Sequence, residues 1–397
     1  MKERFMAKRS LLVGFGGFLP DRVVSNAELA ERLETSDEWI KTRTGITHRH
    51  LVGPNDTAAS MGAEAARRAL DYAGLTADDI DAVFVATATP DQAFPATAVR
   101  VQAALGMKQG FGFDITAACS GFIFALSTAD AFIRSGQIRN ALVIGSEVYS
   151  RIMDWEDRTT CVLFGDGAGA VVLSASDEPG DRGILSTHLH SDGTAGDLLY
   201  VDGAVGQPDK SGHLKMSGRD VFRHAVGKLS SSVDEALEAE GLSYADVDWL
   251  VPHQANIRII EGVAKKLNLP AERVVVTVDR HANTSAASVP LALDEAVRDG
   301  RIQKGDLVLM EALGGGLTWG SALALALAGL WMHYHPQQPL FQKNLLQFQN
   351  LLLQLQMTQL LLRQFLAAFQ PHLVGLLQAQ VFRQQALHRF VESAAHL

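Results

Sequence analysis

The chain contains an internal repeat, which limits the folds open to it more than any other feature. The segment GLTADDID at residues 74–81, followed by the apolar stretch AVFVATA, recurs as GLSYADVD at residues 241–248 before WLVPHQA. A second pair follows in the same order: GQI at 136–138 leads into ALVIGSE, and GRI at 300–302 leads into DLVLMEAL. The two copies are about 165 residues apart. This spacing predicts a duplicated α/β domain whose halves are related by a pseudo-twofold axis.

The repeat also predicts where the parts of the chain begin and end. Each half is expected to finish with a glycine-rich strand, at 164–175 in the first half and 314–327 in the second. We therefore expect one half to span residues 1–180 and the other to span residues 181–327. Residues 328–397 fall outside both copies of the repeat.

The C-terminal tail, residues 328–397, has a different composition from the rest of the chain. From Trp331 onward it contains 14 Gln and 16 Leu but no Asp. Glutamine recurs too often for a membrane span, and the apolar run at 321–331 is too short to cross a bilayer. We expect a helical or disordered segment without catalytic function. A helix that binds a partner protein is the alternative.

The overall composition is that of a globular protein, with 47% hydrophobic and 20% charged residues among 397. The formal net charge of −9 argues against nucleic acid as a partner, because phosphate binding needs a basic face. Two cysteines cannot form a disulfide framework and fit the reducing cytosol. The glycine-broken N-terminal segment does not resemble a signal peptide, so we expect a cytoplasmic protein.

Three chemically capable side chains are expected to meet where the halves join. Counting back 17 residues from Gly136 reaches Cys119, and the same count from Gly300 reaches Asn283. Both residues are therefore predicted at the starts of equivalent helices, which a pseudo-twofold axis brings together. His253 follows the strand WLVP, at the strand end where open α/β sheets usually bind ligands.

These residue types suit the chemistry of acyl thioesters. Cys119 lies between an apolar strand at 110–118 and a helix, and a helix start favours the thiolate nucleophile. His253 and Asn283 offer two uncharged donors, which suit a carbonyl oxygen gaining negative charge when a malonyl thioester is decarboxylated. Each also has an ordinary explanation: Cys119 as a buried structural cysteine, His253 as a satisfied polar residue and Asn283 as a helix cap.

Five motifs in order resemble those of the β-ketoacyl-acyl-carrier-protein synthase III family. They are ETSDEWIKTRTGI, ITAACSGF, VPHQANIRII, ANTSAASVP and GGGLTWG, and the likeness covers residues 9–325. The resemblance implies the thiolase-like duplicated α/β fold, built as five α-β-α-β-α layers. It also implies the initiating condensation of type II fatty-acid synthesis by a homodimer, with no permanently bound cofactor.

The resemblance assigns a role to each matching residue. Cys119 would take an acyl group, typically acetyl, from acyl-CoA, and His253 with Asn283 would bind the thioester of malonyl-loaded acyl carrier protein. The backbone N–H groups of Cys119 and Gly315 would form the oxyanion hole. The remaining implied contacts are Trp39, Arg43 and Arg158 for CoA; Gln254, Ala255, Asn256, Ile257 and Arg258 for docking of the carrier protein; and Phe94, from the neighbouring subunit, for closing the acyl pocket.

Simpler explanations compete with the secondary assignments. Trp39 could be a packing residue, and Arg43 and Arg158 could be ordinary surface charges. GDGAGA at 165–170 lacks the Lys-Ser/Thr of a phosphate loop and is interpreted as a turn into a strand. Cys161 is predicted in the core. No metal is expected, because the histidines show no HExxH spacing and no cysteine pair exists for zinc.

Three functions are compatible with the sequence. The first is the initiating condensing enzyme of fatty-acid synthesis. The second is a related condensing enzyme or acyltransferase of secondary metabolism that uses another primer. The third is an inactive scaffold that binds the carrier protein without turnover. The complete set of Cys119, His253 and Asn283 favours an enzyme.

Overall fold

The computed structural model describes residues 9–177, 183–203 and 209–326. Contacts within the chain define two units, Met1–Leu330 and Trp331–Leu397, and all described residues belong to the first. The predicted tail at 328–397 therefore lies outside the described residues. So does the predicted boundary between residues 180 and 181, which falls in the connection from the last strand of the first half to the first strand of the second.

The first half is built on a five-stranded sheet with the strand order β1-β7-β6-β4-β5. Strands β4, β5 and β6 are parallel, whereas β7 runs antiparallel to both β6 and β1. The elements of this half are β1 (Arg9–Phe18), α3 (Ala58–Ala73), β4 (Ala82–Ala86), α4 (Thr97–Leu105), β5 (Phe111–Ile115), α5 (Gly121–Arg134), β6 (Asn140–Glu147) and β7 (Gly167–Ser176).

The second half repeats this topology in the sheet β11-β12-β13-β8. Strands β11 and β12 are parallel, and β13 runs antiparallel to β12 and β8. In place of a fifth strand, a single parallel bridge joins Leu250 to Val274. The elements are β8 (Gly183–Ser191), α6 (Gly218–Glu240), β11 (Trp249–Pro252), α7 (Ile257–Lys266), α9 (Ser288–Arg298), β12 (Leu307–Gly314) and β13 (Thr318–Leu325). The duplication predicted from the repeat is confirmed.

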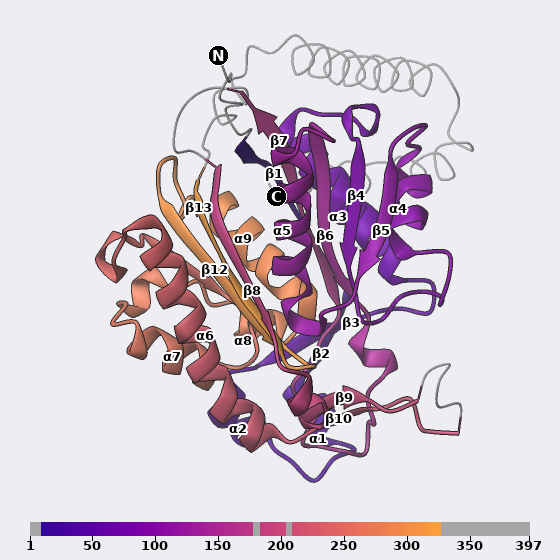
Figure 1. Cartoon of the computed structure of the whole chain (residues 1–397). Helices are drawn as coiled ribbons and strands as arrows, with labels where there is room; N and C mark the ends of the chain where they lie inside the picture. The colour runs from indigo at the N-terminus through magenta and orange to yellow at the C-terminus, as the bar shows by residue number, and fades with distance from the viewer. Residues whose placement is uncertain (1–8, 178–182, 204–208, 327–397) are drawn as a thin grey trace, which may run out of the picture. The chain divides into compact units, whose positions relative to one another are not determined.

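The elements stack in five layers, as Figure 1 shows. Helices α5 and α9 lie between the two sheets, α3 and α4 cover the outer face of the first sheet, and α6 and α7 cover the outer face of the second. The predicted α-β-α-β-α architecture is therefore present. Among the described residues, no helix is long and apolar enough to span a membrane.

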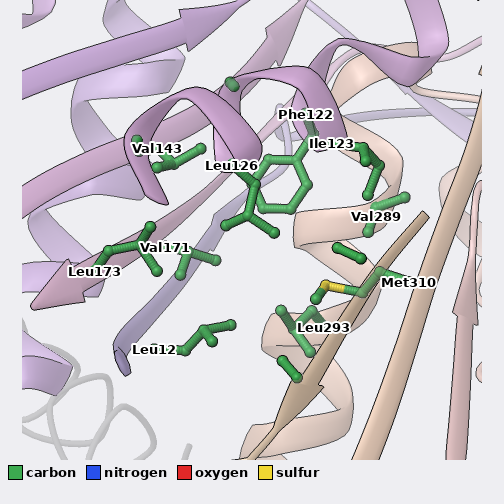
Figure 2. Close-up of a cluster of buried hydrophobic side chains, with 14 of the residues drawn as sticks. Leu12, Phe122, Ile123, Leu126, Val143, Val171, Leu173, Val289, Leu293 and Met310 are labelled. Carbon is green, nitrogen blue, oxygen red and sulfur yellow. The ribbon is translucent and has the colours of Figure 1, made fainter. Parts of the chain in front are cut away.

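The central layer forms because α5 and α9 are apolar on the sides that face both sheets. Phe122 and Leu126 of α5 pack among Val289 and Leu293 of α9 and Met310 of β12, as Figure 2 shows. All five side chains are buried, and burying a side chain of this size contributes about 1.5–3 kcal/mol to folding. This core sets the separation of the two sheets, and hence the distance between their strand ends.

Additional segments surround the strand ends that carry the predicted site. Helix α2 (Asp37–Thr44) is capped at its C-terminus by Gly45, which has a positive φ of 79°. A side chain at Gly45 would also collide with Ile257 of α7. This close contact brings α2 of the first half against the start of α7 of the second. The remaining elements are β2 (Arg22–Ser25), α1 (Asn26–Ala30), α2 (Asp37–Thr44), β3 (His48–Leu51), β9 (Leu199–Val201), β10 (Leu214–Met216) and α8 (Val278–His281).

The starts of α5 and α9 meet where the two halves join. An added Cβ on Gly121 would lie 3.5 Å from the Ala286 Cβ, and one on Gly145 would lie 2.2 Å from the Ala286 carbonyl oxygen. The distance at Gly121 is an ordinary contact, whereas the approach at Gly145 of β6 permits no side chain. The two helices therefore begin in contact, as the pseudo-twofold axis predicts.

The predicted equivalence of Cys119 and Asn283 is wrong. Helix α9 has 11 residues, whereas α5 has 14. Counting back the same 17 residues from the glycine after each helix therefore goes three residues too far in the second half. The backbone gives the correct match, because Ala118 and Ser285 both have a positive φ just before their helices, 44° and 51°. Cys119 is thus equivalent to Ala286, and Asn283 lies three residues before Ala286.

The contact at Gly145 generates a prediction about stability. Gly145→Ala should lower the free energy of unfolding by at least about 1–3 kcal/mol, because the new methyl group overlaps the Ala286 backbone. Chemical denaturation measures the difference. Gly227→Ala in α6 is the control, since an added Cβ there meets nothing within 4 Å and alanine favours the helix. Equal stability of Gly145→Ala and the wild-type protein would contradict the close contact.

Candidate active site

The three predicted catalytic residues line one cavity. Cys119 comes from the first half, and His253 and Asn283 come from the second. The cavity has a volume of about 420 Å³ and extends past Trp39 of α2 to Arg258 of α7. It therefore joins the predicted nucleophile, the predicted donors and five of the predicted substrate contacts in a single continuous space; the five are Trp39, Arg43, Ala255, Asn256 and Arg258.

Cys119 lies in the short turn between β5 and α5, directly after Ala118 with its positive φ. The side chain is buried, with 3% of its surface exposed. Burial raises the pKa of the Cys119 thiol to about 12 and outweighs the hydrogen bonds from Ser285, Tyr149 and the backbone that lower it. Burial therefore favours the thiol of Cys119, against the expected effect of the helix start, which favours the thiolate.

His253 follows β11 and is held at both its backbone and its ring. Its N–H donates to the Glu311 carbonyl oxygen at 2.8 Å, and its Nδ1 is 2.6 Å from the Ser288 Oγ. Burial lowers the pKa of His253 to about 3, so the imidazole is neutral. With Nδ1 engaged by Ser288, Nε2 is the ring nitrogen left for a substrate.

Asn283 is fixed so that its amide nitrogen is available. Its Oδ1 accepts a hydrogen bond of 2.8 Å from the backbone N–H of Ser285. Its own backbone N–H donates to the Leu163 carbonyl oxygen, and its carbonyl accepts from the N–H of Gly165. Because the amide oxygen is used internally, the two amide protons are the groups that Asn283 can offer to the cavity.

The three residues predicted to hold CoA form one cluster beside the cavity. Trp39 lies in α2, whose first turn is capped by Ser36. The guanidinium of Arg43 lies 4.4 Å from the centre of the Trp39 ring, and that of Arg158 lies 5.3 Å away. Arg158 also donates to the Glu34 carbonyl oxygen. An indole beside two cations is suited to a ligand that carries both an aromatic ring and phosphates.

The predicted carrier-docking segment divides into a buried and an accessible part. Gln254 is fully buried, and its amide bonds to the backbone of Pro252, Val275, Thr277 and Val278. Its assignment as a docking side chain is therefore corrected: it ties β11 to the segment before α8.

The rest of that segment reaches the surface. Asn256 caps α7, with its Oδ1 accepting from the N–H of Ile259 at 3.1 Å. Ala255 and Ile257 are half-buried, and Arg258 is exposed at the cavity. Arg258 is thus the one residue of the segment with an accessible charge.

Two further predicted residues lie outside the cavity lining. At the end of β12, Gly314 rather than Gly315 packs on Cys119, since a Cβ added to Gly314 would lie 2.6 Å from the Cys119 backbone nitrogen. Gly315 is the next residue and packs against Leu199. Phe94 is 84% exposed in the loop before α4 and does not reach this chain's cavity.

Sequence reasoning missed the residues that support the catalytic ones. Ser288 contacts His253, while Ser285, Glu147 and Tyr149 form a buried cluster that influences the pKa of Cys119. A signal existed for some of them: both serines belong to the ANTSAASVP motif, and Glu147 is a carboxylate at the end of a mostly apolar strand. Cys161 is fully buried in the core, as predicted. Among the described residues, no cluster of three or more His, Cys, Asp or Glu could hold a metal ion.

Comparisons with known proteins agree with this geometry. The family described as 3-oxoacyl-[acyl-carrier-protein (ACP)] synthase III matches residues 113–193, and its C-terminal part matches residues 237–325. A β-ketoacyl-[acyl-carrier-protein] synthase III of Acidiphilium cryptum is 67% identical over 316 residues, which are 80% of this chain and 99% of that protein. The chain belongs to the β-ketoacyl-acyl-carrier-protein synthase III family. It is therefore an acyl-transferring condensing enzyme, and the resemblance seen in the sequence is confirmed.

Solved structures confirm the family's fold in this chain. The crystal structure of 3-oxoacyl-[acyl-carrier-protein] synthase III from Aquifex aeolicus has a TM-score of 0.76 at 46% identity, covering 80% of this chain and 99% of that one. The priming β-ketosynthase of the R1128 polyketide pathway has a TM-score of 0.77 at 40% identity, covering 82% and 99%. The predicted thiolase-type α/β fold is thus confirmed.

Glu311, whose backbone holds His253, generates a prediction about pH. Its side chain is buried, its Oε2 has no hydrogen-bond partner among the described residues, and burial raises the pKa to about 8. The unfolded chain ionises this group near its ordinary pKa of 4.5, so the stability it contributes is lost as the pH rises from 4.5 to 8. Glu311→Gln removes the titration. The variant's stability relative to wild type should increase by about 1.4 kcal/mol per pH unit in that window.

Denaturation of both proteins at a series of pH values tests this expectation. A difference in unfolding free energy that does not change with pH would show that Glu311 ionises normally in the folded protein.

Proposed function

We propose that this enzyme condenses a short acyl-CoA, acetyl-CoA in the first instance, with malonyl-acyl carrier protein and so initiates fatty-acid synthesis. The observation that carries the proposal is the shared cavity of Cys119, His253 and Asn283, with the cluster of Trp39, Arg43 and Arg158 beside it. The products are CO₂, CoA and a 3-oxoacyl carrier protein. No permanently bound cofactor is needed, because acyl-CoA enters as a substrate.

In the first half-reaction, the Cys119 sulfur attacks the thioester carbonyl of acyl-CoA. The S–C bond forms, the bond from the carbonyl carbon to the CoA sulfur breaks, and CoA leaves. The backbone N–H groups of Cys119 and Gly315 stabilise the negative charge on the carbonyl oxygen. Trp39, Arg43 and Arg158 bind the adenine and phosphates of CoA.

In the second half-reaction, His253 and Asn283 act on the malonyl group. The His253 Nε2–H and an Asn283 amide proton bind the thioester carbonyl, which becomes an enolate when CO₂ leaves. For Nε2 to carry the ring proton of the neutral imidazole, Nδ1 must accept a hydrogen bond. The Ser288 hydroxyl is the donor within reach of Nδ1. The carbanion then attacks the acyl group on Cys119 and frees the sulfur. A neutral imidazole suits this role, because it adds no charge before the enolate forms.

The same proposal covers the partners and the location. Arg258 and the accessible residues Ala255, Asn256 and Ile257 meet the acidic acyl carrier protein. The enzyme acts as a homodimer in the cytoplasm, and the exposed Phe94 closes the acyl pocket of the neighbouring subunit. A large apolar side chain that is 84% exposed supports this role, since it is energetically favourable to bury it against a partner.

A condensing enzyme of a polyketide pathway is the second candidate, because a priming ketosynthase shares the fold. The greater similarity to the Acidiphilium protein favours fatty-acid initiation. The acyl group that Cys119 accepts separates the two. Acetyl-CoA should label the enzyme faster than branched or medium-chain acyl-CoA, and the reverse order would favour a specialised primer.

The acyl-enzyme is the first measurement. Intact-protein mass after incubation with acetyl-CoA should increase by one acetyl group in the wild-type chain and remain unchanged in Cys119→Ala. Malonyl carrier protein should then remove the added mass. Labelling of Cys119→Ala, or of no protein by any acyl-CoA, would contradict the proposal.

Docking of the carrier protein gives a second measurement. Arg258→Glu should raise the KM for malonyl carrier protein severalfold and reduce its dependence on salt, because an attraction at the mouth of the cavity becomes a repulsion. Lys266→Glu, in the last turn of the same helix, is the matched control for the change in charge. Equal effects of the two substitutions would show that net charge matters and that Arg258 has no specific part.

A further inference from the structure

The proposed reaction leaves one proton without an acceptor. Cys119 is a thiol in the described cavity, and its proton must leave when the sulfur becomes acylated. His253 is a weak base here, since burial lowers its pKa to about 3. A better acceptor lies in the buried cluster of Ser285, Tyr149 and Glu147.

Glu147 is a fully buried carboxylate at the end of β6. Its Oε2 accepts hydrogen bonds from the Thr89 hydroxyl at 2.6 Å, the Thr87 hydroxyl at 3.3 Å and the Ala88 N–H at 3.1 Å. Its Oε1 is 3.0 Å from the Ser285 Oγ. Burial raises its pKa to about 7, so near neutral pH it can both take up and release a proton.

Ser285 connects this carboxylate to the nucleophile. Its hydroxyl oxygen is 3.0 Å from Glu147 Oε1 and 2.9 Å from the Tyr149 hydroxyl oxygen. Both hydroxyls lie near enough to the Cys119 thiol to lower its pKa. Ser285 has a single hydroxyl proton, and a carboxylate attracts it more strongly than a phenol oxygen does. Ser285 therefore donates to Glu147, and its lone pairs face Tyr149 and the thiol.

The backbone holds Ser285 in this position. The φ of Ser285, 51°, is unusual for a residue with a side chain. Its backbone N–H donates a hydrogen bond to the Asn283 Oδ1. Strain of this kind is typical of functional sites. Ser285 is the counterpart of Ala118. The turn in the first half positions the Cys119 thiol, and the equivalent turn in the second half positions the Ser285 hydroxyl.

We propose that Ser285 and Glu147 form a buried relay that stores the Cys119 proton while the sulfur carries the acyl group; this inference rests on the proposed condensation. As the sulfur attacks, the thiol proton passes to the Ser285 oxygen and the Ser285 hydroxyl proton passes to Glu147. CoA leaves as a thiolate and takes a proton from water. When the malonyl-derived carbanion releases the Cys119 thiolate, Glu147 returns its proton through Ser285. The overall reaction consumes the one proton that CoA gains.

The test separates the two half-reactions. Single-turnover acylation by acetyl-CoA, followed by intact mass, should slow on the order of 10²-fold in Ser285→Ala and in Glu147→Gln, the range of general acid–base catalysis. Decarboxylation of malonyl carrier protein depends on His253 and Asn283, so adding either substitution to Cys119→Ala should leave it at the Cys119→Ala level. Ser285→Ala keeps the backbone bond to Asn283, and Ala118 shows that alanine occupies the equivalent conformation.

Asp294→Asn is the matched control, because it neutralises another buried carboxylate, which pairs with Arg298 and which no described hydrogen bond links to Cys119. Wild-type acylation rates in Ser285→Ala and Glu147→Gln would overturn the relay, and so would an equal loss of both half-reactions, which indicates a merely structural role. If no acyl-CoA labels the wild-type protein, the proposed condensation fails, and alkylation of Cys119 by iodoacetamide tests the relay alone. Slower alkylation in the two variants would support the relay, and unchanged alkylation would overturn it.

Discussion

The active site depends on the close contact between the starts of α5 and α9. Gly145 of β6 lies against Ala286 with no room for a side chain, Gly121 at the start of α5 packs beside the same residue, and these contacts join the two halves of the duplicated fold. Each half alone holds an incomplete set of groups: the first supplies the proposed nucleophile, and the second supplies the proposed donors for the malonyl carbonyl. A contact between small residues thus creates the cavity in which the two half-reactions take place.

Burial dominates the electrostatics of this cavity. It raises the pKa of the Cys119 thiol and of Glu147 and lowers that of His253, so each group is shifted toward its neutral form. A site of neutral donors is suited to a reaction that creates an oxyanion and an enolate in turn, because neither charge meets a fixed negative neighbour. Arg43 and Arg258 line the cavity and Arg158 lies beside Trp39, and these positive charges are the ones proposed to meet the phosphates and the carrier protein.

Much of this arrangement could be predicted from the sequence, since the repeat carries the topology and the motifs carry the catalytic residues. What could not be predicted depends on three-dimensional packing. The state of Cys119 follows from its burial, which outweighs the helix start. Gln254 lies inside because the segment before α8 uses its amide, a contact that no local pattern shows. The residue equivalent to Cys119 was predicted wrongly as Asn283, because α9 is three residues shorter than α5. The matching positive φ values of Ala118 and Ser285 identify Ala286 as the equivalent residue.

The paired turns at Ala118 and Ser285 also bear on how such a fold can change over evolutionary time. Two copies of one ancestral turn have become unequal, one presenting a sulfur and the other a hydroxyl. Since the two turns contact each other across the junction, a substitution in one turn requires a matching substitution in the other. The duplication has thus lost its redundancy: the halves are an obligate pair, and recombination that exchanged one half for that of a distant relative would have to carry both turns together.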